Sequence, residues 1–192
     1  MNCLYFISWP IIFFTNLFYF TIPPKINLNS LSFYHCIVTT FLSKLFLHNL
    51  DSSKLHNSLV CFSSSYFIWD SLQIVVRKRW KQEWAYLYHH FVCLYMLLHL
   101  YNNENVALIT KILYLGEFSN VFNYIVYHMI KSKNYSEKKI ITVSIIQLCW
   151  FIYFRVYKFT YFIIKDSTKF TNYKLVALLL TIYLMGFIWG WG

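Results

Sequence analysis

Two adjacent histidines, His89 and His90, stand inside a long apolar stretch of the chain. An imidazole titrates near neutral pH, so a histidine in such a place can take a proton from an alcohol or an amine as a general base. A nearby carboxylate can orient the ring and stabilise its cationic form, and Asp70 and Glu117 lie within neighbouring apolar stretches. We therefore predict that His89, His90, Glu117 and Asp70 are catalytic residues.

Further polar residues recur around these four at helical spacing. Asp70 follows Tyr66 by four residues, and Asn120 and Tyr124 follow Glu117 by three and seven, so each set shares one helix face. An ionisable group in lipid costs about 2.5–3.5 kcal/mol, so each one needs a function or a partner. The candidate lipid-binding residues are His35, Tyr66, Asn120, Tyr124 and Arg155. A structural role remains open for each, because buried polar groups also bond membrane helices together.

Composition determines which elements carry these residues. The chain has 192 residues, of which 58% are hydrophobic and 12% charged, whereas a soluble domain usually carries about 25% charged residues. So little polar surface cannot cover the apolar side chains in water, which leaves lipid as the solvent. The apolar runs are continuous and do not alternate as membrane-barrel strands do. The fold class predicted is all-α, a polytopic membrane helix bundle.

About 20 helical residues cross a hydrocarbon core of about 30 Å, so the chain has room for about seven spans. The spans are predicted at 3–22, 31–49, 56–76, 84–101, 106–130, 140–164 and 173–190. The first lacks a basic start and a small-residue cleavage site, so we expect a retained span and not a cleaved signal. The five cysteines are single and form no C-x-x-C pair, so we expect neither a zinc site nor a disulfide framework.

Charge in the loops indicates the orientation. The net charge is +10, and basic runs at 77–81 and 131–139 follow the third and fifth predicted spans. The positive-inside rule places these loops in the cytosol, which makes the N-terminus lumenal or outside and the C-terminus cytosolic. Because the basic residues lie in short loops and not on one soluble face, we expect no nucleic-acid partner. Counting along the helices puts most candidate residues in or near the cytosolic half and Arg155 in the other half.

These polar landmarks, in this order, resemble the TLC-domain family, the membrane domain shared by ceramide synthases and several lipid-regulating proteins. The resembling segments are 65–70 (SYFIWD), 88–91 (YHHF), 116–123 (GEFSNVFN) and 151–155 (FIYFR), with His35 following 32–34 (SFY). The pattern is most similar to the small TLC domain-containing transmembrane proteins. It covers about residues 30–192 as a six-helix domain, with 1–29 as a separate first span and loop.

The resemblance implies an integral membrane protein of the endoplasmic reticulum whose partners are membrane lipids and acyl chains. In ceramide synthases the histidine pair and nearby acids transfer an acyl group from acyl-CoA to a sphingoid amine. By position, His89 and His90 would be the base pair, with Glu117 and Asn120 in place of the acids. However, Cys93 stands where the synthase motif has threonine, and Asn120 cannot act as a carboxylate. These departures favour the lipid-regulating branch, whose members are not established enzymes.

Three hypotheses follow. The first is a lipid-homeostasis protein that binds lipid or acyl chains in a cytosolic-half pocket, with or without catalysis and without a cofactor. The second is an N-acyltransferase of ceramide-synthase type with acyl-CoA as co-substrate. The third is a condensing enzyme resembling fatty-acid elongases, since Asp70, the basic run 77–79 and the histidine pair follow their order. That family's histidine box requires a histidine where this chain has Tyr86, which makes the third hypothesis the weakest.

Overall fold

Helices form nearly all of the computed structural model, which describes residues 3–18, 24–169 and 173–190; these ranges contain no strand. The α-helices are α1 (Cys3–Phe18), α2 (Pro24–His48), α3 (Ser53–Val76), α4 (Trp84–Tyr101), α5 (Val106–Ser132), α6 (Glu137–Phe151), α7 (Phe159–Asp166) and α8 (Tyr173–Gly190). A π-helical segment, Ile152–Lys158, joins α6 to α7, and a 3₁₀ turn, Ser167–Lys169, follows α7. The prediction of an all-α bundle is confirmed.

The starts of the helices test the predicted boundaries. Helices α4, α5 and α8 begin at the predicted residues, whereas α2, α3 and α6 begin before their predicted starts at 31, 56 and 140. The first residues explain the earlier starts of α2 and α3: Pro24 suits a first helical turn, and the Ser52 hydroxyl accepts the Leu55 amide at 3.3 Å. The predicted boundaries leave the polar residues of these first turns in the connections. The predicted end of the first span, at 22, lies outside the described residues.

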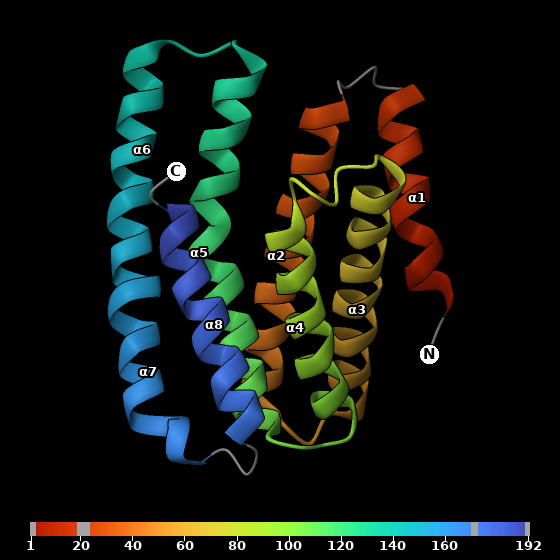
Figure 1. Ribbon diagram of the computed structural model, residues 1–192, viewed down its shortest axis with the longest axis vertical. Coiled ribbons are helices and arrows are strands. Elements are labelled where there is room, and N and C mark those ends of the chain that lie inside the picture. The colour runs from red at the N-terminus through yellow and green to blue at the C-terminus, as the bar shows by residue number, and fades with distance from the viewer. Residues whose placement is uncertain (1–2, 19–23, 170–172, 191–192) are drawn as a thin grey trace.

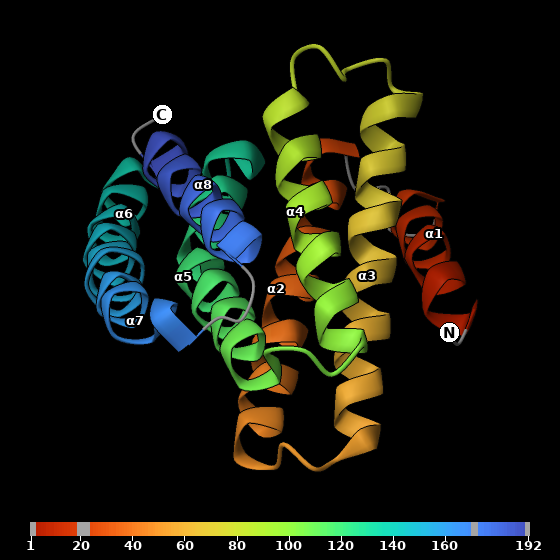
Figure 2. The same ribbon diagram turned by 60° about the horizontal axis from the view of Figure 1, so that its bottom comes forward.

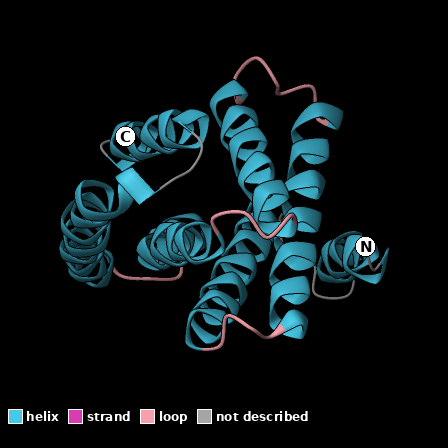
Figure 3. Ribbon diagram, turned by 90° about the horizontal axis from the view of Figure 1, so that it is seen from below, coloured by secondary structure: helices cyan, strands magenta, loops and turns pink. Residues whose placement is uncertain are grey.

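The helices pack as an antiparallel bundle around α2 and α5. These two lie along each other, α3 packs against both α2 and α4, and α6 packs against α5. The α3–α4 and α5–α6 connections lie at one end of the bundle, and the α2–α3 and α4–α5 connections lie at the other (Figure 1). Helix α1 flanks α3 on one side, while α6 and α7 lie on the opposite side of the bundle (Figures 2 and 3).

The outer face of α6, the π segment and α7 is largely apolar, as expected of a lipid-facing surface. In the most apolar stretch of α6, the π segment and α7, only 11% of the stretch is buried inside the protein, compared with 50% in α3. Large apolar side chains stand exposed along it: Ile141, Ile145, Ile146, Leu148, Ile152, Tyr153, Tyr157, Tyr161 and Ile164. An exposed apolar surface of this extent marks contact with lipid or another apolar partner. Among the described residues, three helical stretches qualify as spans by length and hydropathy, at Ile26–His48, Ser53–Val76 and Glu137–Asp166, and the other predicted spans stay predictions.

Inside the bundle, α1 is fastened to α3 by a buried tryptophan. The Trp9 indole Nε1 donates to the Ser65 hydroxyl at 3.0 Å, and its ring contacts Phe62 and Tyr66 at centroid distances of 5.0 and 5.1 Å. Tyr66 in turn stacks on His35 of α2. The first helix therefore supports the aromatic packing around two of the candidate residues.

Candidate functional site

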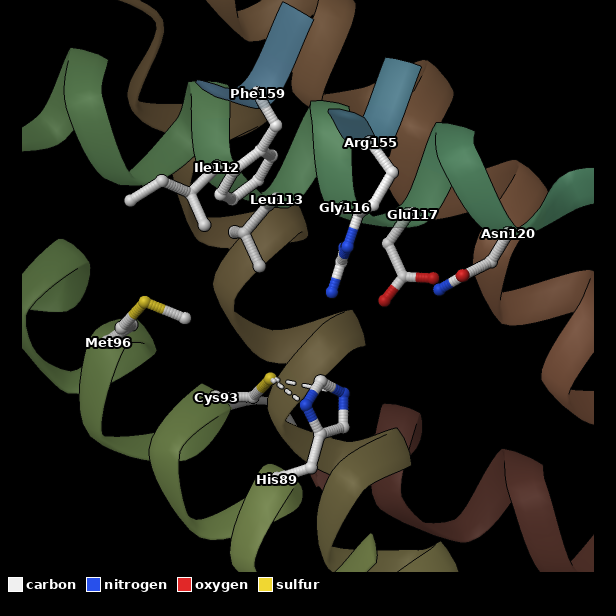
Figure 4. Close-up of a pocket in the computed structure, with 10 residues that line it drawn as sticks. All are labelled: His89, Cys93, Met96, Ile112, Leu113, Gly116, Glu117, Asn120, Arg155 and Phe159. Carbon is white, nitrogen blue, oxygen red and sulfur yellow. Dashed lines mark hydrogen bonds between the residues drawn. The ribbon is translucent and has the colours of Figure 1, made fainter. Parts of the chain in front are cut away.

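A small cavity lies between α4, α5, the π segment and the start of α7 (Figure 4). Its lining residues are His89, Cys93, Met96, Ile112, Leu113, Gly116, Glu117, Asn120, Arg155 and Phe159. Its volume is about 30 Å³, which is enough for about two water molecules. Of the nine residues predicted for the site, the cavity gathers His89, Glu117, Asn120 and Arg155.

The cavity is polar at one end and apolar at the other. On α4, His89 and Met96 are seven residues apart on one face, with His89 nearer the α3–α4 connection. The polar residues of α5 lie toward the same end, because α5 runs antiparallel to α4 and ends there (Figure 1). The third wall is formed by the π segment and the start of α7. There Arg155 precedes Phe159, so the charged residue again lies toward the end with the α3–α4 connection. The polar end therefore faces the end of the bundle that carries the two basic connections.

A buried charge pair forms the polar end. Arg155 is 4% exposed and Glu117 is 9% exposed, and the two side chains interact electrostatically across the cavity. Both project into it in Figure 4. The π segment carries Arg155, and Gly116 leaves room beside it, since a Cβ there would lie 3.6 Å from Arg155 Nη1. Each charge offsets part of the desolvation of the other.

Arg155, predicted to lie in the other half of the bilayer from most candidates, lines the same cavity as Glu117 and His89. Its depth in the bilayer stays a prediction. Counting residues from a span end locates the backbone, whereas a long arginine side chain carries its charge away from its own Cα. The sequence also gave no sign of the π-helical segment, a feature that is frequent at functional sites.

His89 and His90 point to different helices. His89 lines the cavity, where Cys93 Sγ lies 3.6 Å from its Nε2 and 3.9 Å from its Nδ1 (Figure 4). His90 turns toward α3, where its Nδ1 lies 3.1 Å from the Ser71 hydroxyl and its Nε2 lies 3.5 Å from Asp70 Oδ2. Adjacent helical residues point about 100° apart, which accounts for the split.

The hydrogen bonds around His90 assign its tautomer. Ser71 donates its only hydroxyl hydrogen to the Phe67 carbonyl at 2.7 Å, so it accepts the hydrogen of His90 Nδ1. The Nε2 atom, 3.5 Å from Asp70 Oδ2, is then the acceptor of a neutral ring. The contact places a carboxyl group next to the ring but is too long for a strong hydrogen bond.

His35 and Tyr66 lie behind the cavity wall. Their rings stack with centroids 3.9 Å apart and planes at 12°, and the Tyr66 hydroxyl donates to Ser32 at 2.8 Å. His35 is 1% exposed, and its Nδ1 lies 3.9 Å from Glu117 Oε1. His35 and Tyr66 therefore lie outside the lining set, with His35 next to Glu117.

Asn120 and Tyr124 of α5 have different surroundings. Asn120 lines the cavity, and its Oδ1 accepts a hydrogen bond from Asn123 at 3.3 Å. The Oδ1 of Asn123 in turn accepts a hydrogen bond from Gln147 of α6 at 2.9 Å. Tyr124 is outside the lining set, and its backbone carbonyl accepts from Asn29 at 3.1 Å.

The described residues include no group of three His, Cys, Asp or Glu side chains placed to hold a metal ion.

Several residues of the site were not predicted as such. Cys93 and Met96 follow His89 by four and seven residues, so the same spacing rule could have found them. Ser71 has no such signal, because its role depends on the packing of α3 against α4. Lys111, which lies within the fifth predicted span, is not part of the cavity lining, and its Nζ lies 3.2 Å from Asp166 Oδ2.

Fold and site together define a polytopic helical membrane protein with a buried cavity that is charged at one end. The TLC domain profile matches residues 2–192, and the chain belongs to the TLC-domain family, as its polar landmarks predicted. It is 39% identical over 64 residues to TLC domain-containing protein 1 of Gallus gallus, covering 33% of this chain and 25% of that protein. It is 50% identical over 36 residues to the Mus musculus protein of the same name, covering 19% and 15%. The matched segments thus span a quarter or less of these relatives, and no solved structure matches.

Proposed function

We propose that this chain binds a lipid acyl chain in the cavity and acts in membrane-lipid homeostasis. The observation that carries the proposal is the polarity gradient of the cavity. His89 and Arg155 at one end suit the carbonyl or headgroup of an amphiphile, and Met96 and Phe159 at the other suit its hydrocarbon. Membership of the TLC-domain family supports the same function.

The size of the cavity indicates how binding proceeds. Its room of about 30 Å³ is far below the roughly 300–1,000 Å³ of a typical ligand site. A chain can therefore enter only if lining side chains move, and Met96 is the most adaptable of them because methionine is unbranched and flexible. Binding thus widens the space between α4, α5 and α7.

Gly116 offers a direct test with a matched control. Membranes containing the protein are irradiated with a fatty acid that carries a diazirine and an alkyne, and the cross-linked protein is quantified. Gly116→Leu fills the cavity and displaces Arg155, so cross-linking should fall several-fold. Gly116→Ala should keep it, because the added Cβ makes an ordinary contact at 3.6 Å. Cross-linking at the wild-type level in both variants would exclude the cavity as the binding site.

A second candidate function is acyl transfer from acyl-CoA to a lipid amine. It is favoured by His89, a potential base, standing in the same cavity as Arg155, which can stabilise a developing oxyanion. Lipid profiles of a null mutant complemented with His89→Ala or His90→Ala test it. Accumulation of sphingoid base would support the synthase function, and shortened fatty acids would support elongase-like condensation. Complete rescue by both variants, at normal protein levels, excludes catalysis by the pair.

We also propose that the chain lies in the endoplasmic reticulum membrane with the α3–α4 and α5–α6 connections in the cytosol. The support is the clustering of basic residues 77–81 and 131–139 at one end of the bundle (Figure 1). Asn134, in the sequon at 134–136, should then carry no glycan. In intact microsomes Ser136→Cys should react with an impermeant maleimide and Asp51→Cys should not. A glycan on Asn134, or the reverse labelling, contradicts this orientation.

A further inference from the structure

Cys93 and His89 form a contact pair at the border between the polar and apolar parts of the cavity. The Cys93 thiol is 5% exposed and lies 3.6 Å from His89 Nε2, one helical turn away on α4 (Figure 4). A thiol becomes a strong nucleophile when a neighbouring base takes its proton, and a histidine within hydrogen-bonding reach is the usual base.

The surroundings of this pair supply the other parts of an acyl-transfer site. Arg155 lines the same cavity as Cys93, and its side chain projects into the cavity from the wall opposite α4 (Figure 4). A fixed cation there can stabilise the oxyanion that forms when a thiolate attacks a carbonyl. Beyond Cys93 the cavity continues along Met96 and Phe159, where the hydrocarbon of an acyl group would lie.

The other described cysteines differ from Cys93. Cys36 donates to the Glu117 backbone carbonyl at 2.9 Å, Cys61 is half-buried on α3 outside the cavity lining, and Cys149 is exposed on the lipid-facing α6. Among the described cysteines, only Cys93 lines the cavity. The chain thus contains its own control thiols.

We propose that Cys93 is an acyl-accepting nucleophile that takes the acyl group of an acyl thioester bound in the cavity, with His89 as its base. The Sγ–H proton passes to His89, and the thiolate attacks the thioester carbonyl carbon, forming a new S–C bond. The tetrahedral oxyanion faces Arg155 and collapses with cleavage of the C–S bond to the donor. The donor thiol leaves with the proton returned by His89, so nothing is oxidised or reduced.

The class of donor follows from the chemistry. Exchange of one thioester for another breaks and forms bonds of the same kind, so it needs no further energy source. An oxygen ester or an amide is more stable than the thioester that Cys93 would form, and transfer from either would run uphill. The inference rests on the proposed binding of acyl chains in this cavity and adds the covalent acceptor to it.

The test uses the full chain in lipid nanodiscs with an alkyne-tagged long-chain acyl-CoA. The tag should become attached to the protein, be released by neutral hydroxylamine, and map to the peptide that contains Cys93. Cys93→Ala should abolish the label, His89→Gln should slow its formation at least about tenfold, and Cys61→Ala should leave it unchanged. Labelling that maps only to Cys149, or that persists in Cys93→Ala, would overturn the inference.

Photo-cross-linking of the diazirine fatty acid to Cys93→Ala separates the two proposals. If that variant still cross-links while the wild-type chain never acquires a hydroxylamine-sensitive label, the acyl chain binds but Cys93 is not its acceptor. If Gly116→Leu and Gly116→Ala also cross-link equally, the binding site itself is wrong. If Cys93→Ala keeps the cross-linking but loses the covalent label that the wild-type chain acquires, the result supports both proposals.

Discussion

The charge pair at the polar end of the cavity predicts an asymmetric response to mutation. Glu117→Gln leaves the Arg155 guanidinium buried without its counter-charge, and a guanidinium cannot lose its proton. Removing one partner of a buried pair costs about 3–5 kcal/mol. At roughly 2–4 °C per kcal/mol for a chain of this size, the unfolding midpoint should fall by about 6–20 °C.

The reverse substitution should cost less. Arg155→Met leaves a buried carboxyl group that can take up a proton and become neutral, and methionine keeps most of the buried hydrocarbon. We expect a loss of about 1–2 kcal/mol, that is roughly 2–8 °C, which shrinks as the pH is lowered. The double variant should resemble Arg155→Met alone, because the uncompensated guanidinium is gone.

Thermal unfolding in lipid nanodiscs at pH 7 and pH 5, followed by tryptophan fluorescence, measures all four proteins of this cycle. The difference between the double variant and the sum of the single variants gives the coupling energy. Strictly additive effects, with coupling below about 0.5 kcal/mol, would show that the two charges do not stabilise each other. An equal loss in the two single variants would refute the argument from proton uptake.

Two further predictions concern contacts outside the cavity. Trp9→Phe removes the donor that bonds the Ser65 hydroxyl at 3.0 Å, and it should destabilise the fold by about 1–3 kcal/mol, measured as a lower unfolding midpoint; an unchanged midpoint would mean that α1 is not fastened by this bond. Asp166→Asn removes ion pairs to Lys111 at 3.2 Å and Lys169 at 2.6 Å. Since both lysines are substantially exposed, the loss should be at most about 1 kcal/mol per pair and should vanish at high salt; a loss that is independent of salt would contradict a surface ion-pair role.

Much of the candidate site could be predicted because polar residues in apolar spans are costly and therefore stand out. His89, Glu117 and Arg155 were all identified in this way and line one cavity. The apolar part of the cavity gave no such signal, since Met96 and Phe159 look like any other residue of a membrane helix. A cavity is a property of facing helices, and no single stretch of sequence contains it.

By itself, the sequence determined the helices and the family. Local forces are enough for that: long apolar runs require helices whose backbone groups are satisfied within each span, and capping and charged connections separate one helix from the next. Only the tertiary structure decided which polar groups meet. The rotation of each helix about its own axis depends on all its neighbours, and the packing of α4 between α3 and α5 turned His89 into the cavity and His90 toward Asp70.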